Sequence, residues 1–276
     1  MTWLFTLCAD DYGMSEGVST GILEAARAAR INAASAMTGL PDWPRAAAVW
    51  NETRPPATLG LHLNLTLGAP LGPMPALAPG GVFPSIGVVA RARDLPGDEI
   101  CAEIGRQIDA FVVHAGRAPD HVDGHQHVHV LPVVRDALFA ALRARGYRAM
   151  TLRDSGDRPT RILRRRSCVP KALAVATLAR GFAGAAREAG FPCNEGFTGF
   201  STFDPRADPA AQFARYLVAP GRRHLVMCHP GHVDDALRAL DPVTAARETE
   251  LRFLLSDAWP ALLARAGAGL HAPQQP

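Results

Sequence analysis

Short apolar runs alternate with longer amphipathic stretches along the chain. Buried strands are expected for the apolar runs, and helices for the stretches whose apolar residues recur every three or four positions. The predicted strands cover residues 3–9, 33–39, 57–65, 120–124, 147–153 and 223–229. The predicted helices cover residues 15–30, 43–53, 98–116, 131–146 and 244–257. This alternation predicts an α/β fold in which helices cover a parallel sheet.

Three segments fall outside this alternation. Residues 68–84 are rich in Pro and Gly and predict a long loop, of the kind that often serves as a lid. Residues 154–200 predict an insertion, and the apolar stretch 172–186 within them predicts a helix that faces the core. Residues 266–276 predict a disordered tail. No shift in composition marks a linker, so we expect one domain over residues 1–265.

Composition and charge narrow the class of protein. The length of 276 residues suits one large α/β barrel or two small domains, and the net charge of +3 is too small to indicate nucleic-acid binding. The five cysteines are odd in number and widely spaced, which indicates free thiols in a reducing compartment. The start of the chain does not resemble a signal peptide, and no stretch suits a bilayer span. We therefore expect a cytoplasmic protein without stable membrane insertion.

Polar side chains stand where the predicted strands end. Asp10 and Asp11 follow the first strand, and the others lie at the ends of five later strands. These others are Thr38, His62, Asn64, Asp123, His125, Thr151, Arg153 and His229. Reactive groups of parallel α/β barrels lie at the carboxyl ends of the strands, so we expect these side chains to meet at one end of the fold.

Each of these residues also has a structural explanation. Two aspartates before a helix often cap it, a lone histidine on an apolar strand is commonly structural, and His229 beside Pro230 fits a turn. The segment HVDGHQHVHV, residues 121–130, is harder to explain in this way, because several buried imidazoles each need a hydrogen-bond partner. Taken together, the residues favour a metal site.

The residue types at these strand ends match the needs of a hydrolase. One carboxylate and two imidazoles are a common ligand set for a catalytic divalent metal, with positions left open for water and substrate. A second carboxylate beside such a site can take a proton from the metal-bound water. A histidine from another strand, with a pKa near neutral pH, can give a proton to the leaving group. This equipment suits hydrolysis of an amide or an ester.

Four motifs occur in order along the chain, namely ADDYGMSEGV, GLHLNLTLGAPL, HVDGHQHVHVLP and VMCHPG. Together they resemble the YdjC-like carbohydrate deacetylases, a family that includes chitooligosaccharide deacetylases and relatives associated with hopanoid biosynthesis. The resemblance covers roughly residues 5–260. It implies a distorted, TIM-like (β/α) barrel and the metal-dependent removal of acetyl from an N-acetylated sugar.

The resemblance also implies roles for individual residues. The matching metal ligands are Asp11, His62 and His125. The one divalent ion is Mg²⁺ or Zn²⁺, because the ligand types suit zinc while relatives are commonly described with magnesium. Asp10 matches the base that activates the metal-bound water, and His229 matches the acid.

The histidine-rich segment needs a break in its strand. Alternate residues of a strand share one face, yet one metal ion cannot take five ligands from one short strand. Gly124 allows the break, so that His125 faces the metal and His127 lies in the next loop as a substrate contact, a neighbour of the ligands or an extra ligand. We expect His121 to be structural and Asp123 to orient a ligand imidazole.

Further contacts to substrate are less defined by the sequence. Arg153 and Asn64 are candidates to contact the substrate or the ligands. The basic run Arg161–Arg166 is expected to be a solvated face, with an anionic or lipid-linked substrate as the alternative. Candidates for stacking on a sugar are Trp43, Phe83, Phe197, Phe200 and Phe203.

Other functions stay open beside the deacetylase. They are another metal-dependent amidohydrolase, a phosphoesterase, and a non-catalytic sugar-binding protein. A phosphoesterase is disfavoured because the sequence shows neither a second carboxylate cluster nor a Gly-rich phosphate loop. The expected partner is an N-acetylated sugar, with no nucleic acid, and a homodimer is left open.

Overall fold

A computed structural model describes residues 2–272. Its centre is a curled sheet whose neighbouring strands all pair in parallel, in the order β5-β4-β3-β2-β1-β7-β6, with β8 paired to the start of β1. The strands are β1 (Trp3–Tyr12), β2 (Ala33–Ala36), β3 (Thr58–Leu63), β4 (His121–Gly124), β5 (Thr151–Leu152), β6 (Phe197–Thr198), β7 (Leu225–Cys228) and β8 (Ala268–Leu270).

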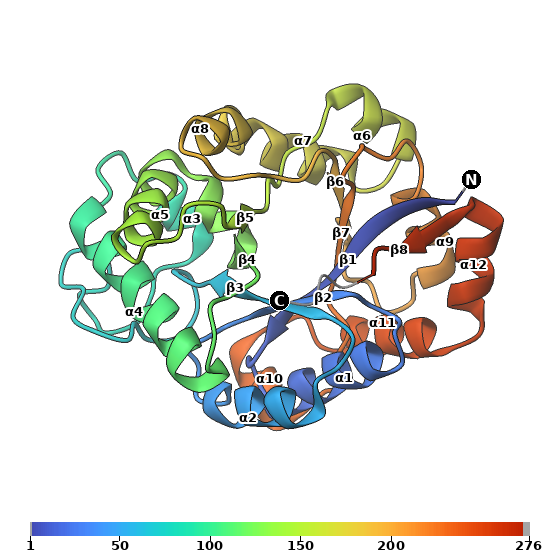
Figure 1. The fold of residues 1–276 in the computed structure, drawn as a ribbon, viewed down its shortest axis with the longest axis horizontal. Helices are drawn as coiled ribbons and strands as arrows, with labels where there is room; N and C mark the ends of the chain where they lie inside the picture. The colour runs from blue at the N-terminus through green and yellow to red at the C-terminus, as the bar shows by residue number, and fades with distance from the viewer. Residues whose placement is uncertain (1, 273–276) are drawn as a thin grey trace.

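Helices surround this sheet on the outside (Figure 1). They are α1 (Glu16–Arg27), α2 (Trp43–Thr53), α3 (Ile86–Val89), α4 (Gly97–Ala115), α5 (Pro132–Ala144), α6 (Pro159–Arg165), α7 (Val169–Leu178), α8 (Phe182–Glu188), α9 (Pro209–Tyr216), α10 (Asp235–Leu240), α11 (Ala245–Leu255) and α12 (Ala258–Ala266), and the 3₁₀ segment η1 (His125–Val130) follows β4. The arrangement confirms the predicted α/β fold, a distorted TIM-like barrel.

The barrel is distorted where its two edge strands approach each other. β5 has two residues. The second of them, Leu152, forms a single parallel bridge to Cys193, which precedes β6. The backbone N–H of Leu152 donates to the carbonyl of Pro192 at 2.8 Å. The predicted strand 147–153 was therefore too long. Between β5 and the segment ahead of β6, one bridge replaces the series of hydrogen bonds that would close a regular barrel.

The segment between β5 and β6 differs from its prediction. The apolar stretch 172–186 forms parts of two helices, α7 and α8, which are separated at Gly181 with φ 84°. Ala172 is the buried residue of α7, so the expected single core-facing helix is wrong. Gly181 directly precedes α8, and as a glycine it takes the left-handed conformation of this turn at low steric cost.

The end of the chain is more ordered than expected. Residues 268–270 form β8, which pairs with Trp3, Leu4 and Phe5 of β1. The disordered tail predicted from residue 266 is therefore wrong for this strand, while residues 273–276 lie outside the described part. Within residues 2–272, no helix combines the length and the apolar character that a membrane crossing requires.

The loop 68–84 is irregular, as predicted, but it is attached to α4. Glu103 accepts a hydrogen bond from the N–H of Leu71, and Glu99 accepts from those of Ala76 and Leu77. Because two helix carboxylates bind its backbone, this loop has a defined place beside the barrel.

Candidate active site and metal centre

A bulge in β1 points two neighbouring aspartates into the barrel. The register between β1 and β2 shifts between Ala9 and Tyr12, and Asp11 has φ 77°. Neighbouring side chains of a regular strand point to opposite faces, whereas a bulge re-aims one of them. Asp10 and Asp11 therefore lie inside β1, which continues past its predicted end at residue 9.

The three predicted metal ligands meet at this bulge. The Oδ1 of Asp11 lies 3.1 Å from the Nδ1 of His125 and 3.4 Å from the Nε2 of His62. All three side chains are buried and offer ligand atoms close enough to share one cation. One carboxylate and two imidazoles from β1, β3 and η1 thus form a compact donor set.

Asp11 has a second partner that the sequence did not indicate. Its Oδ2 accepts a hydrogen bond from Arg247 of α11 at 2.8 Å, and Arg247 also binds Asp241 at 2.8 Å. Burial alone would raise the pKa of Asp11, but Arg247 and the histidines outweigh it and hold that pKa well below its usual range.

Asp10 is held by a different arginine. Arg153 donates to both oxygens of Asp10, at 2.7 and 2.6 Å, and also contacts the carboxylate of Asp123. Arg153 is fully buried, and His129 lies with its Nε2 2.8 Å from the backbone carbonyl of Arg153. The predicted base is therefore fixed by a two-pronged ion pair.

Asp123 contacts His62, the imidazole predicted from the sequence to be a ligand. Its Oδ1 lies 2.6 Å from the Nδ1 of His62. Burial by itself would lower the pKa of His62, but Asp123, Asp10 and Asp11 raise it to about 10. Because a carboxylate accepts the Nδ1 proton, the Nε2 of His62 is directed toward Asp11.

His229 stands at the end of β7, and its backbone N–H donates to the carboxylate of Glu250 at 2.7 Å. Phe203 packs edge-on against its ring at 5.1 Å. The buried Nδ1 has no hydrogen-bond partner among residues 2–272. Burial lowers the pKa of His229 to about 4, below the value near neutral pH that the sequence suggested.

Two predicted contact residues have structural surroundings. The Oδ1 of Asn64 accepts from the N–H groups of Thr66 and Leu67, and its amide donates to the carbonyl of Leu67, so its side chain folds its own turn. His127 packs edge-on against Phe197 and Phe200 and joins none of the metal-competent groups among the described residues.

Comparisons with known proteins show the family of this chain. The family model described as YdjC-like protein matches residues 4–265. A chitooligosaccharide deacetylase of Salmonella heidelberg (strain SL476) is 32% identical over 268 residues, which cover 94% of this chain and 93% of that protein. The chain belongs to the YdjC-like family.

Two further comparisons place this YdjC-like chain. A chitooligosaccharide deacetylase of Enterobacter sp. (strain 638) is 40% identical over 135 residues, and the match spans 49% of this chain and about half, 53%, of that relative. A solved structure from Enterococcus faecalis V583, described as a cellobiose-phosphate cleavage protein, has a TM-score of 0.76 and 22% identity, covering 98% of this chain and 97% of its own. That likeness supports the fold.

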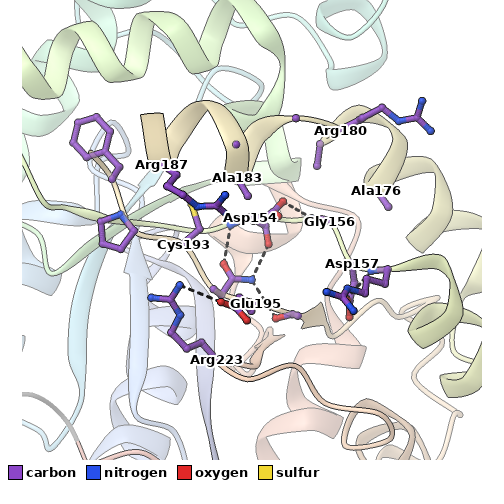
Figure 2. A pocket seen from close by; sticks show the side chains of 18 of the residues that line it. Asp154, Gly156, Asp157, Ala176, Arg180, Ala183, Arg187, Cys193, Glu195 and Arg223 are labelled. Carbon is purple, nitrogen blue, oxygen red and sulfur yellow. Dashed lines mark hydrogen bonds and ion pairs between the residues drawn. The ribbon is translucent and has the colours of Figure 1, made fainter. Parts of the chain in front are cut away.

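A large cavity of the YdjC-like chain lies away from these residues. It measures about 860 Å³ and lies between α7, α8 and the segment ahead of β6, and none of the predicted catalytic or metal residues lines it. Figure 2 shows Asp154 and Glu195 in this cavity, with Arg223 paired to Glu195 at 3.6 Å. Arg161, in the basic run of the sequence, also lines it and pairs with Asp157 at 3.2 Å.

Among the aromatic residues suggested for sugar stacking, one stands beside the site. Trp43, Phe83, Phe197 and Phe200 are buried in the core. Phe203 is half-buried and contacts His229 on one side, and the Nζ of Lys171 lies over its ring at 4.8 Å. Phe203 is therefore the aromatic side chain best placed to meet a sugar ring.

Proposed function

We propose that this protein removes acetyl groups from an N-acetylated sugar with the help of one divalent cation. The observation that carries the proposal is the meeting of Asp11, His62 and His125 around one point, with Asp10 next to them on the same strand. The deacetylase names of the YdjC-like relatives support the substrate class. An N-acetylated oligosaccharide or glycolipid fits this chemistry.

The donor set suits a divalent cation. Asp11 offers one carboxylate oxygen, and His62 and His125 offer one nitrogen each, and all three side chains are buried. Nitrogen and carboxylate donors suit zinc, whereas magnesium prefers oxygen, so we favour zinc and keep magnesium as the alternative. A cation there would polarise the acetyl carbonyl and lower the pKa of a nearby water.

The protein's own groups divide the proton transfers. Asp10 is assigned to accept the proton of the attacking water, while Arg153 holds its carboxylate in place. His229 is assigned to give a proton to the departing nitrogen. Because the lowered pKa of His229 disfavours its charged ring in the resting protein, His229 takes that proton from solvent during each turnover, and Asp10 returns the proton of the attacking water to solvent.

The test of this proposal is acetate release. The metal-depleted protein should release no acetate from N-acetylglucosamine oligomers, and added Zn²⁺ or Mg²⁺ should restore release. Asp11→Asn is the matched control, because it removes one ligand and should abolish the response to metal. Failure to release acetate from any N-acetylated sugar, free or lipid-linked, with metal bound would overturn the proposal, and phosphate release from phosphoesters would indicate the phosphoesterase.

The assignment of His229 has its own test. A departing amine needs a proton, whereas the phenolate of an aryl acetate does not, so loss of the acid should matter much less for the ester. We expect His229→Ala to bind metal normally and to lose about a hundred- to ten-thousandfold in amide cleavage. Equal losses on an N-acetyl sugar and on an aryl acetate that the wild type accepts would show that His229 has a different task.

A further inference from the structure

A chain of hydrogen bonds extends from His62 of the proposed metal site through Asp123 and Ser35 to His121. The Oδ2 of Asp123 accepts from the hydroxyl of Ser35 at 2.6 Å, on the side opposite to His62. The Ser35 Oγ lies 3.0 Å from the Nε2 of His121. The single hydroxyl proton of Ser35 goes to the carboxylate, so Ser35 must accept the Nε2 proton of His121.

The directions of these bonds fix the state of each ring. Arg153 and Ser35 both donate to Asp123, which therefore acts as an acceptor toward His62 as well. The Nδ1–H of His62 donates a hydrogen bond to Asp123. This bond orients the ring so that Nε2 points toward the proposed cation site. The order His121, Ser35, Asp123, His62 is thus one connected row of donors and acceptors.

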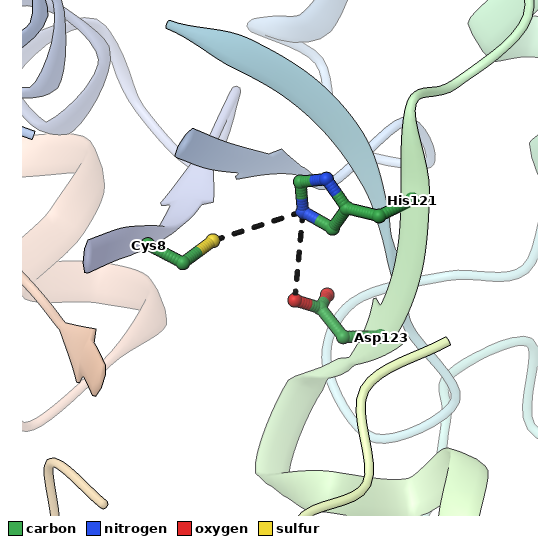
Figure 3. A group of neighbouring side chains, drawn as sticks. All are labelled: Cys8, His121 and Asp123. Atoms are coloured by element: carbon green, nitrogen blue, oxygen red, sulfur yellow. Dashed lines mark hydrogen bonds and ion pairs between the residues drawn. The ribbon is translucent and has the colours of Figure 1, made fainter. Parts of the chain in front are cut away.

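Packing holds His121 at the end of this row. A side chain at Gly60 of β3 would place its Cβ 2.4 Å from the Nε2 of His121, so the ring fits only because residue 60 is glycine. The Sγ of Cys8 lies 3.2 Å from the Oγ of Ser35 and 3.7 Å from the Nε2 of His121. Figure 3 shows Cys8, His121 and Asp123 facing one another from β1 and β4.

His121 also borders a separate cavity. This cavity measures about 610 Å³, and Thr58, Asp120 and Thr151 line it beside His121. It lies at the starts of the strands, whereas the predicted ligands lie at their ends. The row of hydrogen bonds therefore crosses the barrel interior from one end toward the other.

We propose that Ser35 and His121 are positioning residues for the metal ligand His62. His121 donates to Ser35, and Ser35 donates to the Oδ2 of Asp123. Asp123 in turn orients the ring of His62 so that Nε2 points toward Asp11. This inference rests on the proposed function, because it takes Asp11, His62 and His125 as the metal ligands. The sequence predicts a structural role for His121. The structure extends that role to His62, which His121 reaches through Ser35 and Asp123.

Four single variants test the role. Ser35→Ala removes the middle of the row, and His121→Phe keeps a ring while it removes the Nε2 proton. His121→Gln places an amide N–H where Nε2 was and should restore the bond. Thr151→Val is the matched control, because Thr151 pairs with His121 across β4 and β5 and lines the same cavity.

The first measurement is the affinity of the metal-depleted protein for Zn²⁺, by competition with a chromophoric chelator. We expect Ser35→Ala and His121→Phe to bind zinc about 10- to 100-fold more weakly, as for other residues that support metal ligands. His121→Gln should recover most of the affinity, and Thr151→Val should match the wild type. The double variant Ser35→Ala with His121→Phe should be no weaker than the weaker single variant, because both break one row.

The second measurement needs no metal. The Nδ1 proton of His62 should give a downfield ring signal in ¹H–¹⁵N spectra of the metal-depleted protein, and it should shift in Ser35→Ala and His121→Phe but not in Thr151→Val. An unchanged signal in both variants would overturn the inference, and so would unchanged zinc affinity. A wild type that binds neither zinc nor magnesium would instead overturn the proposed function, while the ring signal would still decide whether Ser35 and His121 position His62.

Discussion

Asp10 and Asp11 are neighbours in one bulge, yet their surroundings differ. Both oxygens of Asp10 accept hydrogen bonds from Arg153, which follows β5 at the carboxyl end of the barrel. In Asp11 only Oδ2 accepts a hydrogen bond from an arginine, namely Arg247 of the outer helix α11. Its Oδ1 faces His62 and His125.

This difference suits the separate tasks that we propose for two identical side chains. A carboxylate whose two oxygens both accept from a guanidinium is held rigidly and offers little to a cation. A carboxylate with one oxygen directed at two imidazoles is ready to share a cation with them. The positions of Arg153 and Arg247, more than those of the aspartates themselves, therefore distinguish the proposed base from the proposed ligand.

The largest expected effects come from exchanging each aspartate for asparagine. Asp11→Asn should lose zinc binding, because an amide oxygen is a weak substitute for a carboxylate ligand. Asp10→Asn should keep zinc but lose roughly a hundred- to ten-thousandfold in turnover, because an amide cannot accept the proton. Zinc content and acetate release measured on both variants check this, and loss of zinc in both would remove the contrast between the two residues.

The next largest effects should come from replacing the arginine that contacts each aspartate. Arg153→Met leaves Asp10 and Asp123 buried without their cation, which should cost about 3–5 kcal/mol of unfolding free energy. Arg247→Met should also destabilise the metal-free protein, but zinc should restore part of the loss, because a cation then stands next to Asp11.

Chemical denaturation with and without zinc measures both arginine effects. The matched control is Arg206→Met, which removes an exposed pair with Asp204 and should have no measurable effect. If zinc restored the stability of the Arg153 and Arg247 variants equally, a cation would compensate for either arginine. The proposal that Asp11 binds the cation and Asp10 does not would then be wrong.

The smallest effect concerns Glu250, one turn after Arg247 on α11. Burial raises the pKa of Glu250 from 4.5 to about 7. Between these values the unfolded chain loses its proton while the folded one keeps it, so wild-type stability should fall as pH rises through this window. Glu250→Gln still accepts the N–H of His229 but does not titrate.

Denaturation at several pH values measures this difference. The variant and the wild type should be equally stable near pH 4.5, and above about pH 7 the variant should be more stable by up to about 3 kcal/mol. A gap that is the same at every pH would mean that Glu250 keeps its charge beside Arg247, as Asp11 does.

The sequence predicted the site where strand ends converge, and it missed what lies elsewhere. That rule predicted that Asp11, His62 and His125 would lie close together, because parallel strands bring their ends together, while the family resemblance selected these three as ligands. Arg247 was missed because it lies in a helix and resembles the many other arginines of the chain. Ser35 was missed because a small residue in a short strand shows no chemical signal until its neighbours are placed.

Local backbone conformation was also beyond the sequence pattern. The strand break after Gly124 was predicted, and Gln126 and His127 indeed have positive φ values of 51° and 62°. The bulge at Asp11 was not predicted, because nothing in the alternation of apolar and polar residues marks it. Burial of His229 likewise depends on Phe203 and on neighbouring elements, so its lowered pKa follows only from the assembled fold.

The pairing of β8 with β1 has a consequence for how the chain folds during synthesis. β1 is made first, and β2 is soon available beside it, but the partners on its other edge, β7 and β8, emerge only after nearly every other element. The edge of β1 that faces β7 and β8 therefore depends on contacts that are distant in sequence. Such contacts slow folding, so we expect this edge to pair late.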